Sequence, residues 1–289
     1  MCLFAGALTV APHAALLGQE AVPRFSSAVQ AVEVYATVTD SAGEPVTGLG
    51  AGDFQLDDDR QPQIISTFAE GAFPLTVALG VDRSWSMAGE PLRLARRAAQ
   101  SFLEQLRPAD RALVVAINAE AEVIAPLTAD RSAQARAIAA LDPWSTTALR
   151  DAVIKTLDRL EPEPGRQALV VFSDGVDRFS HLSAAAMVDR ARRGSALVYP
   201  IVLGRAPVAV LSEVAALTGG RSFALRDAQG LEAALGTIAR ELRHQYLLGY
   251  VPTPAAASEP GRWHPIRVRV RGQEAKGWRV RARDGYGGR

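Results

Sequence analysis

The sequence predicts an α/β protein with a doubly wound, mostly parallel sheet and a small antiparallel β module built from both flanks of the chain. Two patterns carry this prediction. In the middle of the chain, short apolar runs alternate with stretches whose apolar residues recur every three or four positions, which is typical of buried parallel strands joined by helices. Toward both ends, apolar and polar residues alternate with a period of two, which indicates half-buried antiparallel strands.

The composition is that of a globular protein with a packed core. The chain has 289 residues, of which 48% are hydrophobic and 22% are charged, and these values exclude wholesale disorder and a polytopic membrane protein. A formal net charge of +1 creates no field that would attract nucleic acid, so we expect no nucleic-acid partner. The single cysteine, Cys2, cannot form an intramolecular disulfide.

The first residues are similar to an export signal. Residues 1–18 are apolar and small, like the hydrophobic region of a signal peptide, so we expect residues 1–20 to be a leader and the mature chain to be periplasmic or extracellular. No Lys or Arg precedes Arg24, which leaves an N-terminal helix of the fold as the alternative. No other stretch reaches the roughly 18 apolar residues of a membrane span, so we expect none in the mature chain.

The N-terminal flank carries the first period-two pattern. Residues 32–39 predict one strand, and residues 54–56 and 64–68 predict a strand pair. The acidic triplet Asp57, Asp58 and Asp59 lies between the members of that pair. Because turns favour Asp, we expect a solvated hairpin tip here, with a cation site as the alternative.

The middle of the chain carries the alternating elements of the parallel sheet. Strands are predicted at residues 75–81, 112–117, 123–125, 168–172, 197–202 and 222–225. Helices are predicted at residues 91–106, 131–141, 148–160, 183–193, 208–218 and 229–243.

The C-terminal flank returns to a period of two. Aliphatic residues alternate with arginines in residues 266–270 and 279–283, which predicts a hairpin across residues 272–277. Neither flank alone buries enough apolar surface to be stable. We therefore expect residues 30–70 and 245–286 to pack together as one β module, with residues 72–244 inserted between them as the α/β domain.

Polar clusters lie where a doubly wound sheet places its ligands, after the carboxyl ends of strands. Asp82, Ser84 and Ser86 follow the first strand, Thr147 begins a helix, and Asp174 follows the strand that ends at residue 172. Taken singly, the hydroxyls could be helix N-caps and Asp174 part of a turn. Together, their oxygens suit a hard cation such as Mg²⁺.

These residues, in this order, resemble a von Willebrand factor type A domain, whose metal-ion-dependent adhesion site combines a D-x-S-x-S loop with a distant Thr and a distant Asp. The resemblance covers residues 75–242 and implies a Rossmann-like fold. It assigns Ser84, Ser86 and Thr147 as direct ligands of Mg²⁺ or Mn²⁺. It places Asp82 and Asp174 in the inner or outer coordination shell.

Two further features bear on this resemblance. Trp85, Ser145 and Thr146 stand where many members of the family carry small glycines, which makes the loops stiffer and the rim bulkier. The flanking strands, expected at residues 32–39 and 45–49 before the domain and near residues 246–250 after it, are similar to those of an exported bacterial subgroup, the VWFA-related proteins. That subgroup implies no specific activity.

The leading functional hypothesis is a metal-dependent protein-binding module outside the cytoplasm, without enzymatic activity. A cation held by neutral hydroxyls can accept an exposed Asp or Glu of a protein partner as a further ligand. Trp85 would then be an anchor on the rim of the site, unless it packs on the adjacent helix.

Two alternatives remain. A hydrolase would use Ser84, Ser86 or Ser173 as nucleophile, and His181 is the only histidine near enough in the chain to serve as its base. A metal-free scaffold would instead bind anionic surfaces through the C-terminal arginines, although the pattern favours a solvated strand face for them, because Lys and Arg also protect strand edges from aggregation.

Overall fold

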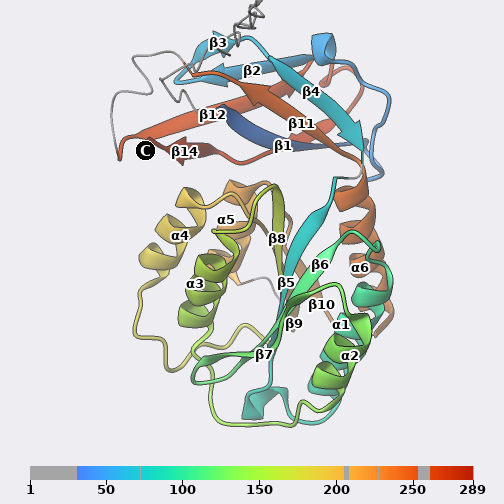
Figure 1. The fold of residues 1–289 in the computed structure, drawn as a ribbon, viewed down its shortest axis with the longest axis vertical. Helices are drawn as coiled ribbons and strands as arrows, with labels where there is room; N and C mark the ends of the chain where they lie inside the picture. Colours follow the sequence, from blue (N-terminus) through green and yellow to red (C-terminus); the bar gives the residue numbers. More distant parts are fainter. Residues whose placement is uncertain (1–30, 72, 205–207, 227, 253–260, 289) are drawn as a thin grey trace, which may run out of the picture.

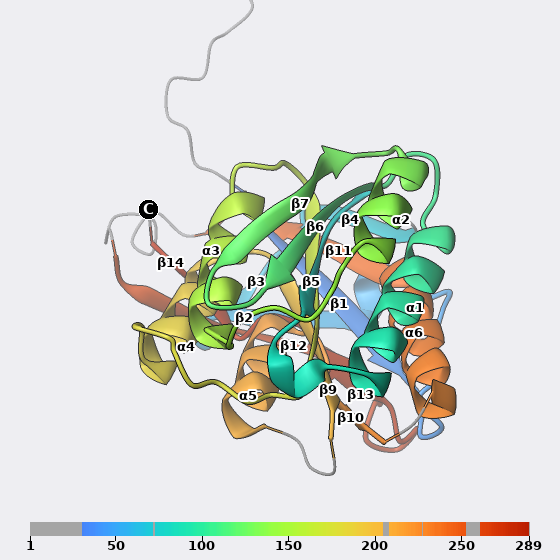
Figure 2. The same ribbon diagram turned by 90° about the horizontal axis from the view of Figure 1, so that it is seen from below.

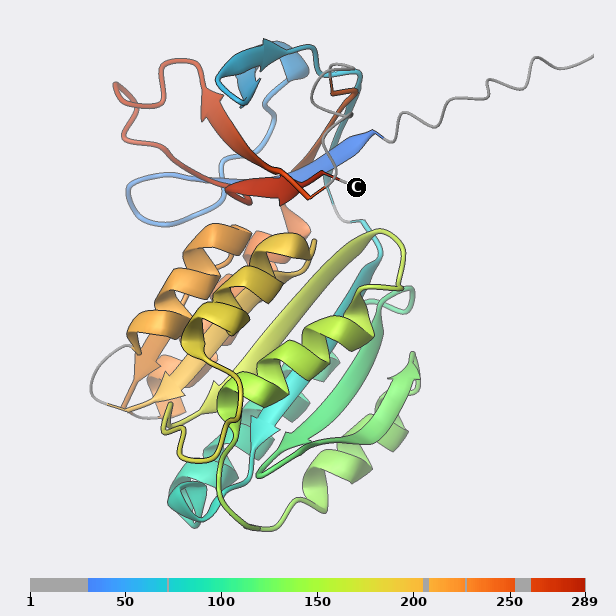
Figure 3. The same ribbon diagram turned by 90° about the vertical axis from the view of Figure 1, so that its left-hand side faces the viewer.

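A computed structural model describes residues 31–71, 73–204, 208–226, 228–252 and 261–288. The predicted leader at residues 1–20 therefore lies outside the described residues. A sandwich of antiparallel sheets lies over one end of an α/β domain, as the side view shows best (Figures 1 and 3). Within the described residues, no helix has the length and apolar character needed to cross a membrane.

The α/β domain is built on a six-stranded sheet with the order β10-β9-β8-β5-β6-β7. Neighbouring strands are parallel except β7, which is antiparallel to β6. This arrangement confirms the doubly wound, mostly parallel sheet. Its strands are β5 (Leu75–Asp82), β6 (Arg111–Ile117), β7 (Ala121–Thr128), β8 (Arg166–Ser173), β9 (Leu197–Leu203) and β10 (Phe223–Leu225).

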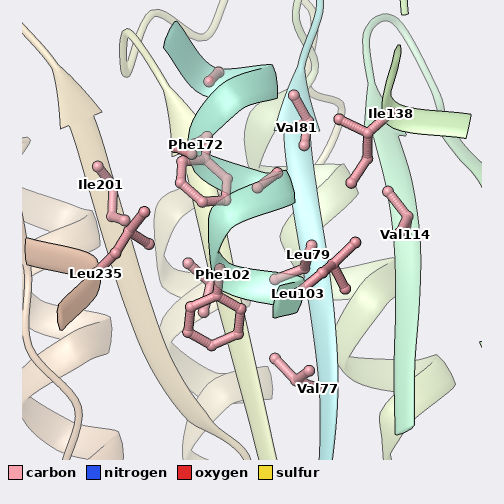
Figure 4. Packing of buried hydrophobic residues seen from close by; sticks show 14 of the residues in the cluster. Val77, Leu79, Val81, Phe102, Leu103, Val114, Ile138, Phe172, Ile201 and Leu235 are labelled. Carbon is pink, nitrogen blue, oxygen red and sulfur yellow. The ribbon is translucent and has the colours of Figure 1, made fainter. Parts of the chain in front are cut away.

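Helices cover both faces of this sheet (Figures 1 and 2). One face packs against α1 (Glu90–Glu104), α2 (Arg131–Ala139) and α6 (Ala228–Arg243), and the other against α3 (Leu149–Leu160), α4 (Ala184–Arg193) and α5 (Ala209–Thr218). Figure 4 shows Leu79 of β5 beside Phe102 of α1 in the first of these layers. Because successive side chains of β5 enter opposite layers, all eight of its residues are buried, which explains its continuous apolar run.

Side-chain caps explain where two of the helices begin. The Asp130 side chain accepts a hydrogen bond from the backbone N–H of Ala133 at the start of α2. Ser183 does the same for Ala186 at the start of α4. Each cap satisfies a backbone donor that the first helical turn leaves without a partner.

The β module consists of two four-stranded sheets, ordered β13-β1-β11-β4 and β14-β12-β2-β3. Both flanks of the chain contribute strands to each sheet, which confirms a small antiparallel module built from both flanks. Its N-terminal strands are β1 (Val32–Thr39), β2 (Phe54–Asp58), β3 (Gln61–Gln63) and β4 (Thr67–Gly71), with the short helix η1 (Ala51–Asp53) before β2. Its C-terminal strands are β11 (Gln245–Tyr250), β12 (Trp263–Val270), β13 (Arg279–Arg281) and β14 (Gly285–Gly287).

Two predicted pairings in this module are wrong, and a third is shorter than expected. β12 pairs with β2 and β14, whereas β13 pairs with β1 in the other sheet, so the two arginine-rich strands do not form a hairpin. β2 pairs with β3, and β4 pairs with β11, so residues 54–56 and 64–68 are not a strand pair. Residues 45–49 form only an isolated bridge between Pro45 and Thr39. A period of two identifies strands but does not specify their partners.

The arginines of these strands also differ from a uniformly solvated face. Arg281 on β13 forms an ion pair of 2.5 Å with Glu241 of α6, which is fully buried, and Arg221 approaches the same carboxylate at 3.5 Å. Arg269 on β12 pairs with Asp57 at 2.6 Å, whereas Arg279 is exposed. The Arg281–Glu241 pair therefore joins the β module to the α/β domain.

Candidate functional site

The candidate site lies at the carboxyl ends of the parallel strands, on the side of the domain that faces away from the β module (Figures 1 and 2). β5 lies between β6 and β8 in the sheet. After β5 the chain continues to β6, which is its neighbour in the sheet, and after β8 it continues to β9, which lies farther from β5 on the opposite side. The connections that follow β5 and β8 therefore run in opposite directions along the sheet. Such a switch point is where doubly wound sheets form ligand crevices.

Asp82 ends β5 and forms the buried floor of the site. It is 0% exposed, and each of its carboxylate oxygens has a partner in the protein. Oδ1 accepts a hydrogen bond from the backbone N–H of Ser84 at 2.9 Å, and Oδ2 accepts one from the Ser173 hydroxyl at 2.6 Å. Burial raises the pKa of Asp82; the hydrogen bonds from Ser173 and Ser84 oppose this, and the nearby charge of Asp174 adds to it.

Ser84 and Ser86 lie in the loop that follows this carboxylate in the chain. Ser84 is the N-cap of the short helix η2 (Trp85–Met87), and Ser86 lies within it. Their hydroxyl oxygens are 3.2 Å apart. Adjacent ligands of an octahedral Mg²⁺ ion are about 3.0 Å apart, as follows from bonds of about 2.1 Å at right angles. Both hydroxyls can therefore contact one cation after a small movement.

The loop that precedes α3 brings Thr147 to the crevice. The backbone carbonyl of Thr147 accepts hydrogen bonds from the N–H groups of Arg178 and Phe179, both at 3.1 Å, and these tie it to the loop after β8. Ser145 adopts a φ of 63°, a left-handed conformation that favours glycine, and its carbonyl accepts a hydrogen bond from the Trp85 N–H at 3.0 Å. The bond to η2 helps to hold this strained loop residue in place.

Asp174 follows β8 and turns the chain away from the sheet. Its Oδ1 accepts a hydrogen bond from the backbone N–H of Val176 at 2.9 Å. Gly175 has a φ of 79°, and a Cβ added there would lie 2.4 Å from the Val208 side chain, so only glycine fits. This local order fixes the position of the Asp174 carboxylate.

The structure thus brings the predicted site residues to one edge of the sheet. Asp82, Ser84 and Ser86 are joined by hydrogen bonds, and Ser173 completes this group. Within the described residues, no hydrogen bond joins the side chains of Thr147 or Asp174 to the two serines of η2. We use "the crevice" below for Asp82, Ser84, Ser86, Thr147 and Asp174.

Large apolar side chains surround the crevice. Trp85 is 63% exposed, so it does not pack on the adjacent helix. Trp144 and Phe179, on the loops before α3 and after β8, are 60% and 56% exposed. The sequence analysis missed these two. The signal that could have found them is a bulky apolar residue outside any helix or strand, close to a site motif.

The three histidines in the described part of the chain form no hydrogen bond with the serines of the crevice. The His181 side chain is 93% exposed, and its Nδ1 lies 3.4 Å from Asp151. His264 lies in the β module, and His244 follows α6. In the part of the chain that the structure describes, no histidine forms a hydrogen bond with Ser84, Ser86 or Ser173.

The acidic triplet differs from the expected solvated hairpin tip. Asp59 and Arg60 form the turn between β2 and β3, with φ values of 49° and 66°. Asp58, however, is only 2% exposed, because it follows Phe54 and Leu56 on the inner face of the sandwich. The expectation of a solvated tip is therefore wrong for Asp58. Its oxygen lies near those of Asp59 and a ring nitrogen of His264.

A comparison with protein families supports the resemblance seen in the sequence. Residues 77–176 match the family described as the von Willebrand factor type A domain. This segment runs from β5 to the loop after β8 and contains every residue of the crevice. A search of the curated proteins finds no match to this chain.

Solved structures share the fold. An aerotolerance-related membrane protein from Bacteroides fragilis, carrying multiple mutations to serine, is 18% identical with a TM-score of 0.50, over 58% of this chain and 98% of that one. The von Willebrand factor domain of a type V pilus tip protein from Porphyromonas gingivalis is 14% identical with a TM-score of 0.50, over 58% and 95%. Proximal thread matrix protein 1 from the mussel byssus is 15% identical with a TM-score of 0.51, over 64% and 51%. Together with the family match, these similarities support a domain of the von Willebrand factor type A kind.

Proposed function

We propose that this chain is a metal-dependent protein-binding module, which holds Mg²⁺ or Mn²⁺ in the crevice and accepts an Asp or Glu side chain of a protein partner. A domain of the von Willebrand factor type A kind points to interaction or adhesion. One observation carries the metal dependence. The hydroxyls of Ser84 and Ser86 lie 3.2 Å apart, in the loop that follows a buried Asp82 whose two oxygens are already bonded within the protein.

The donor set fits a hard divalent cation. Ser84, Ser86 and Thr147 would contact the ion directly through neutral hydroxyls. Asp82 would act mainly through water, because the Ser84 N–H and the Ser173 hydroxyl already occupy its two oxygens. Asp174, in the loop after β8, would contribute a negative charge that partly neutralises the cation. Without thiolate or imidazole in the set, Zn²⁺ should not be preferred over Mg²⁺.

The charge distribution favours an acidic partner. Neutral hydroxyls leave the ion most of its positive charge, so an incoming carboxylate is attracted strongly and completes the octahedron. A bound cation also stabilises the ionised form of Asp82, which burial otherwise disfavours. The ion supplies a Lewis-acidic position, while the protein residues fix where it sits.

The apolar rim supplies the remaining contact area. Trp85, Trp144 and Phe179 are exposed on the three loops that border the crevice. Aromatic side chains of this kind are enriched among the residues that dominate binding energy at protein interfaces. We propose that they surround the coordinated carboxylate and exclude water from it.

Two further statements belong to this proposal. Export from the cytoplasm rests on the apolar residues 1–18. The division into a leader at residues 1–20, an α/β domain at 72–244 and a β module from 30–70 and 245–286 rests on the period-two patterns and the strand pairings.

A peptide selection tests the proposed function. Random peptides displayed on phage are selected on the immobilised full chain in Mg²⁺, and we expect the enriched peptides to share an Asp or Glu and to be released by chelator. Ser86→Ala and Thr147→Ala should each weaken binding by at least about tenfold, which corresponds to about 1.4 kcal/mol. Ser132→Ala, at an exposed hydroxyl on α2, is the matched control and should bind like the wild type.

The opposite pattern would transfer the function to another surface. Peptides that ignore chelator and Ser86→Ala, but lose binding when Arg267 and Arg279 are replaced by Ala, would identify the arginines of the β module as the binding site. Hydrolysis of a selected peptide, lost in Ser84→Ala, would instead identify a hydrolase.

A further inference from the structure

We propose that Asp58, Asp59 and His264, called the inner cluster below, form a second metal site that binds one divalent transition metal of the zinc type. This site lies in the β module, outside the segment that matches the von Willebrand factor type A family. It is independent of the crevice and of the function proposed for it.

The fold places polar side chains where the strand pattern otherwise places apolar ones. On β2, the buried positions are Phe54, Leu56 and Asp58. On β12, His264 occupies the same face as the buried Ile266, which is paired with Asp58. The Asp58 carboxylate is therefore the last inward-facing side chain of β2, and the His264 imidazole is the first buried side chain of β12.

The distances suit a single ion. His264 Nδ1 lies 2.7 Å from Asp59 Oδ2 and 4.0 Å from Asp58 Oδ1. One ligand atom from each of the three residues lies within 4.8 Å of the others. Metal–ligand bonds of about 2.1 Å place tetrahedral Zn²⁺ ligands about 3.4 Å apart, so the His264–Asp59 distance must open by about 0.7 Å and the His264–Asp58 distance must close by about 0.6 Å.

Asp58 is held with one oxygen free to ligate. Its Oδ2 accepts hydrogen bonds from the hydroxyls of Tyr250 and Tyr286, both at 2.9 Å. Asp58 Oδ1 is buried without a hydrogen-bond partner and lies toward His264. Partners that orient a ligating carboxylate in this way are typical of metal sites.

The charge of the inner cluster also favours a cation. Asp58 is 2% exposed and Asp59 lies beside it, with Arg262 at 3.5 Å from Asp59 Oδ2. A buried carboxylate without a compensating cation is unfavourable, and a divalent ion between the two carboxylates would neutralise both. The imidazole ligand selects against Mg²⁺ and Ca²⁺, which prefer oxygen, and favours Zn²⁺.

The surroundings of His264 predict a moderate affinity of the inner cluster for Zn²⁺. Coordination through Nδ1 leaves the ring proton on Nε2, which is buried without a partner. A ligating histidine usually donates this proton to an acceptor, and loss of such a partner weakens metal binding by about 10–100-fold. The Asp59 side chain is 24% exposed, which provides access for the ion and for water as the fourth ligand.

A metal here would join the two flanks of the chain. Asp58 and Asp59 belong to the N-terminal flank, whereas His264 belongs to β12 of the C-terminal flank. The ion should therefore stabilise the β module in addition to the β2–β12 pairing.

Zinc titration of the full chain tests this site. Chelator-treated protein in excess Mg²⁺ is titrated with Zn²⁺ by calorimetry, and thermal unfolding is followed with and without Zn²⁺. We expect one Zn²⁺ per chain and a higher Tm with zinc. His264→Gln and Asp58→Asn should weaken binding by at least about tenfold and remove the rise in Tm. Asp57→Asn is the matched control, because Asp57 pairs with Arg269 and is outside the inner cluster.

Asp59→Asn keeps the test decisive if the buried variants fail to fold, because Asp59 is partly exposed at the turn. It should also lower zinc affinity by at least about tenfold. No Zn²⁺ uptake by the wild type would overturn the proposal, as would equal uptake by His264→Gln or by Asp59→Asn. Zinc binding lost in Ser84→Ala but kept in His264→Gln would also overturn it, because the ion would then lie in the crevice.

Discussion

The crevice and the inner cluster both gather oxygen donors around a buried aspartate, yet they use opposite parts of the fold. In the crevice, Asp82 ends a strand and the other donors come from loops at the edge of the sheet. In the inner cluster, Asp58 and His264 occupy strand positions that face the middle of a sandwich. The crevice has an apolar rim open to solvent, whereas in the inner cluster Tyr250 and Tyr286 donate hydrogen bonds to the buried Asp58 and the partly exposed Asp59 faces solvent at the turn.

This difference shows how the place of a polar group in the fold limits what it can do. Loops at the carboxyl ends of parallel strands can leave one side of a cation open to a partner. In the inner cluster Asp58 and His264 are buried and Asp59 at the turn is partly exposed, so a cation there would mainly hold strands together. The crevice is therefore expected to control binding, and the β module to control stability.

The largest expected effect comes from removing one flank of the β module. A chain without residues 31–71 lacks β1 and β2, the partners of β11, β13 and β12. We expect the C-terminal flank to lose its protease protection completely, because its strands would have unpaired edges and an exposed core. Limited proteolysis followed by mass spectrometry measures this. A tail that stays protected in the truncated chain would show that the two flanks are not one module.

A smaller effect is expected at the contact between the module and the α/β domain. Arg281→Ala leaves Glu241 buried with only Arg221, at 3.5 Å, as a counter-charge. Removing one member of a buried ion pair typically lowers the free energy of unfolding by about 3–5 kcal/mol. Urea denaturation measures it, with the exposed Arg279→Ala as control at less than about 0.5 kcal/mol. Mg²⁺ affinity should not change, and a parallel loss of Mg²⁺ binding would contradict the separation of roles.

The buried Asp82 of the crevice should make the stability of the metal-free protein depend on pH. Because burial raises the pKa of Asp82 above 3.8, the folded protein keeps this proton at pH values where the unfolded chain has released it. Without metal, the free energy of unfolding contributed by Asp82 therefore falls as pH rises above about 4. Asp82→Asn removes this titration, so the metal-free variant should become more stable relative to the metal-free wild type as the pH rises above about 4.

Urea denaturation of both metal-free proteins across this range provides the comparison. Saturating Mg²⁺ should restore wild-type stability at neutral pH and have no such effect on Asp82→Asn. A difference between the two proteins that is constant with pH would contradict the buried, ionisable floor of the crevice.

The smallest effect on stability is expected at the apolar rim. Trp85 is 63% exposed, so Trp85→Ala should change the free energy of unfolding by less than about 0.5 kcal/mol. The same change should weaken binding of a selected acidic peptide by at least about tenfold if Trp85 is an interface anchor. Surface plasmon resonance and urea denaturation give the two values. Unchanged peptide affinity would remove Trp85 from the binding surface.

The central sheet could be predicted closely because its signals are local. The predicted strands at residues 75–81 and 168–172 correspond to β5 and β8, since strands buried on both faces must be continuously apolar. The placement of Asp82 and Asp174 at neighbouring strand ends followed from the same pattern. Whether these residues bind a metal stays a prediction.

The β module could not be predicted to the same depth because its pairings are distant in sequence. β1 pairs with β11 across the whole inserted domain, and nothing in residues 32–39 specifies that partner. The burial of Asp58 and His264 was missed for the same reason, because their enclosure depends on Tyr250 and Tyr286 from other strands. The exposed Trp144 and Phe179 were missed because bulky residues in loops have no periodicity.

The most direct test of the central claim is a Mn²⁺ titration of the metal-free full chain, followed by electron paramagnetic resonance. We expect one Mn²⁺ per chain that Mg²⁺ displaces, with affinity lowered by at least about tenfold in Ser84→Ala and Thr147→Ala and unchanged in His264→Gln. Mn²⁺ binding that persists in Ser84→Ala and Thr147→Ala would show that the crevice is not the metal site, as would binding that disappears only in His264→Gln.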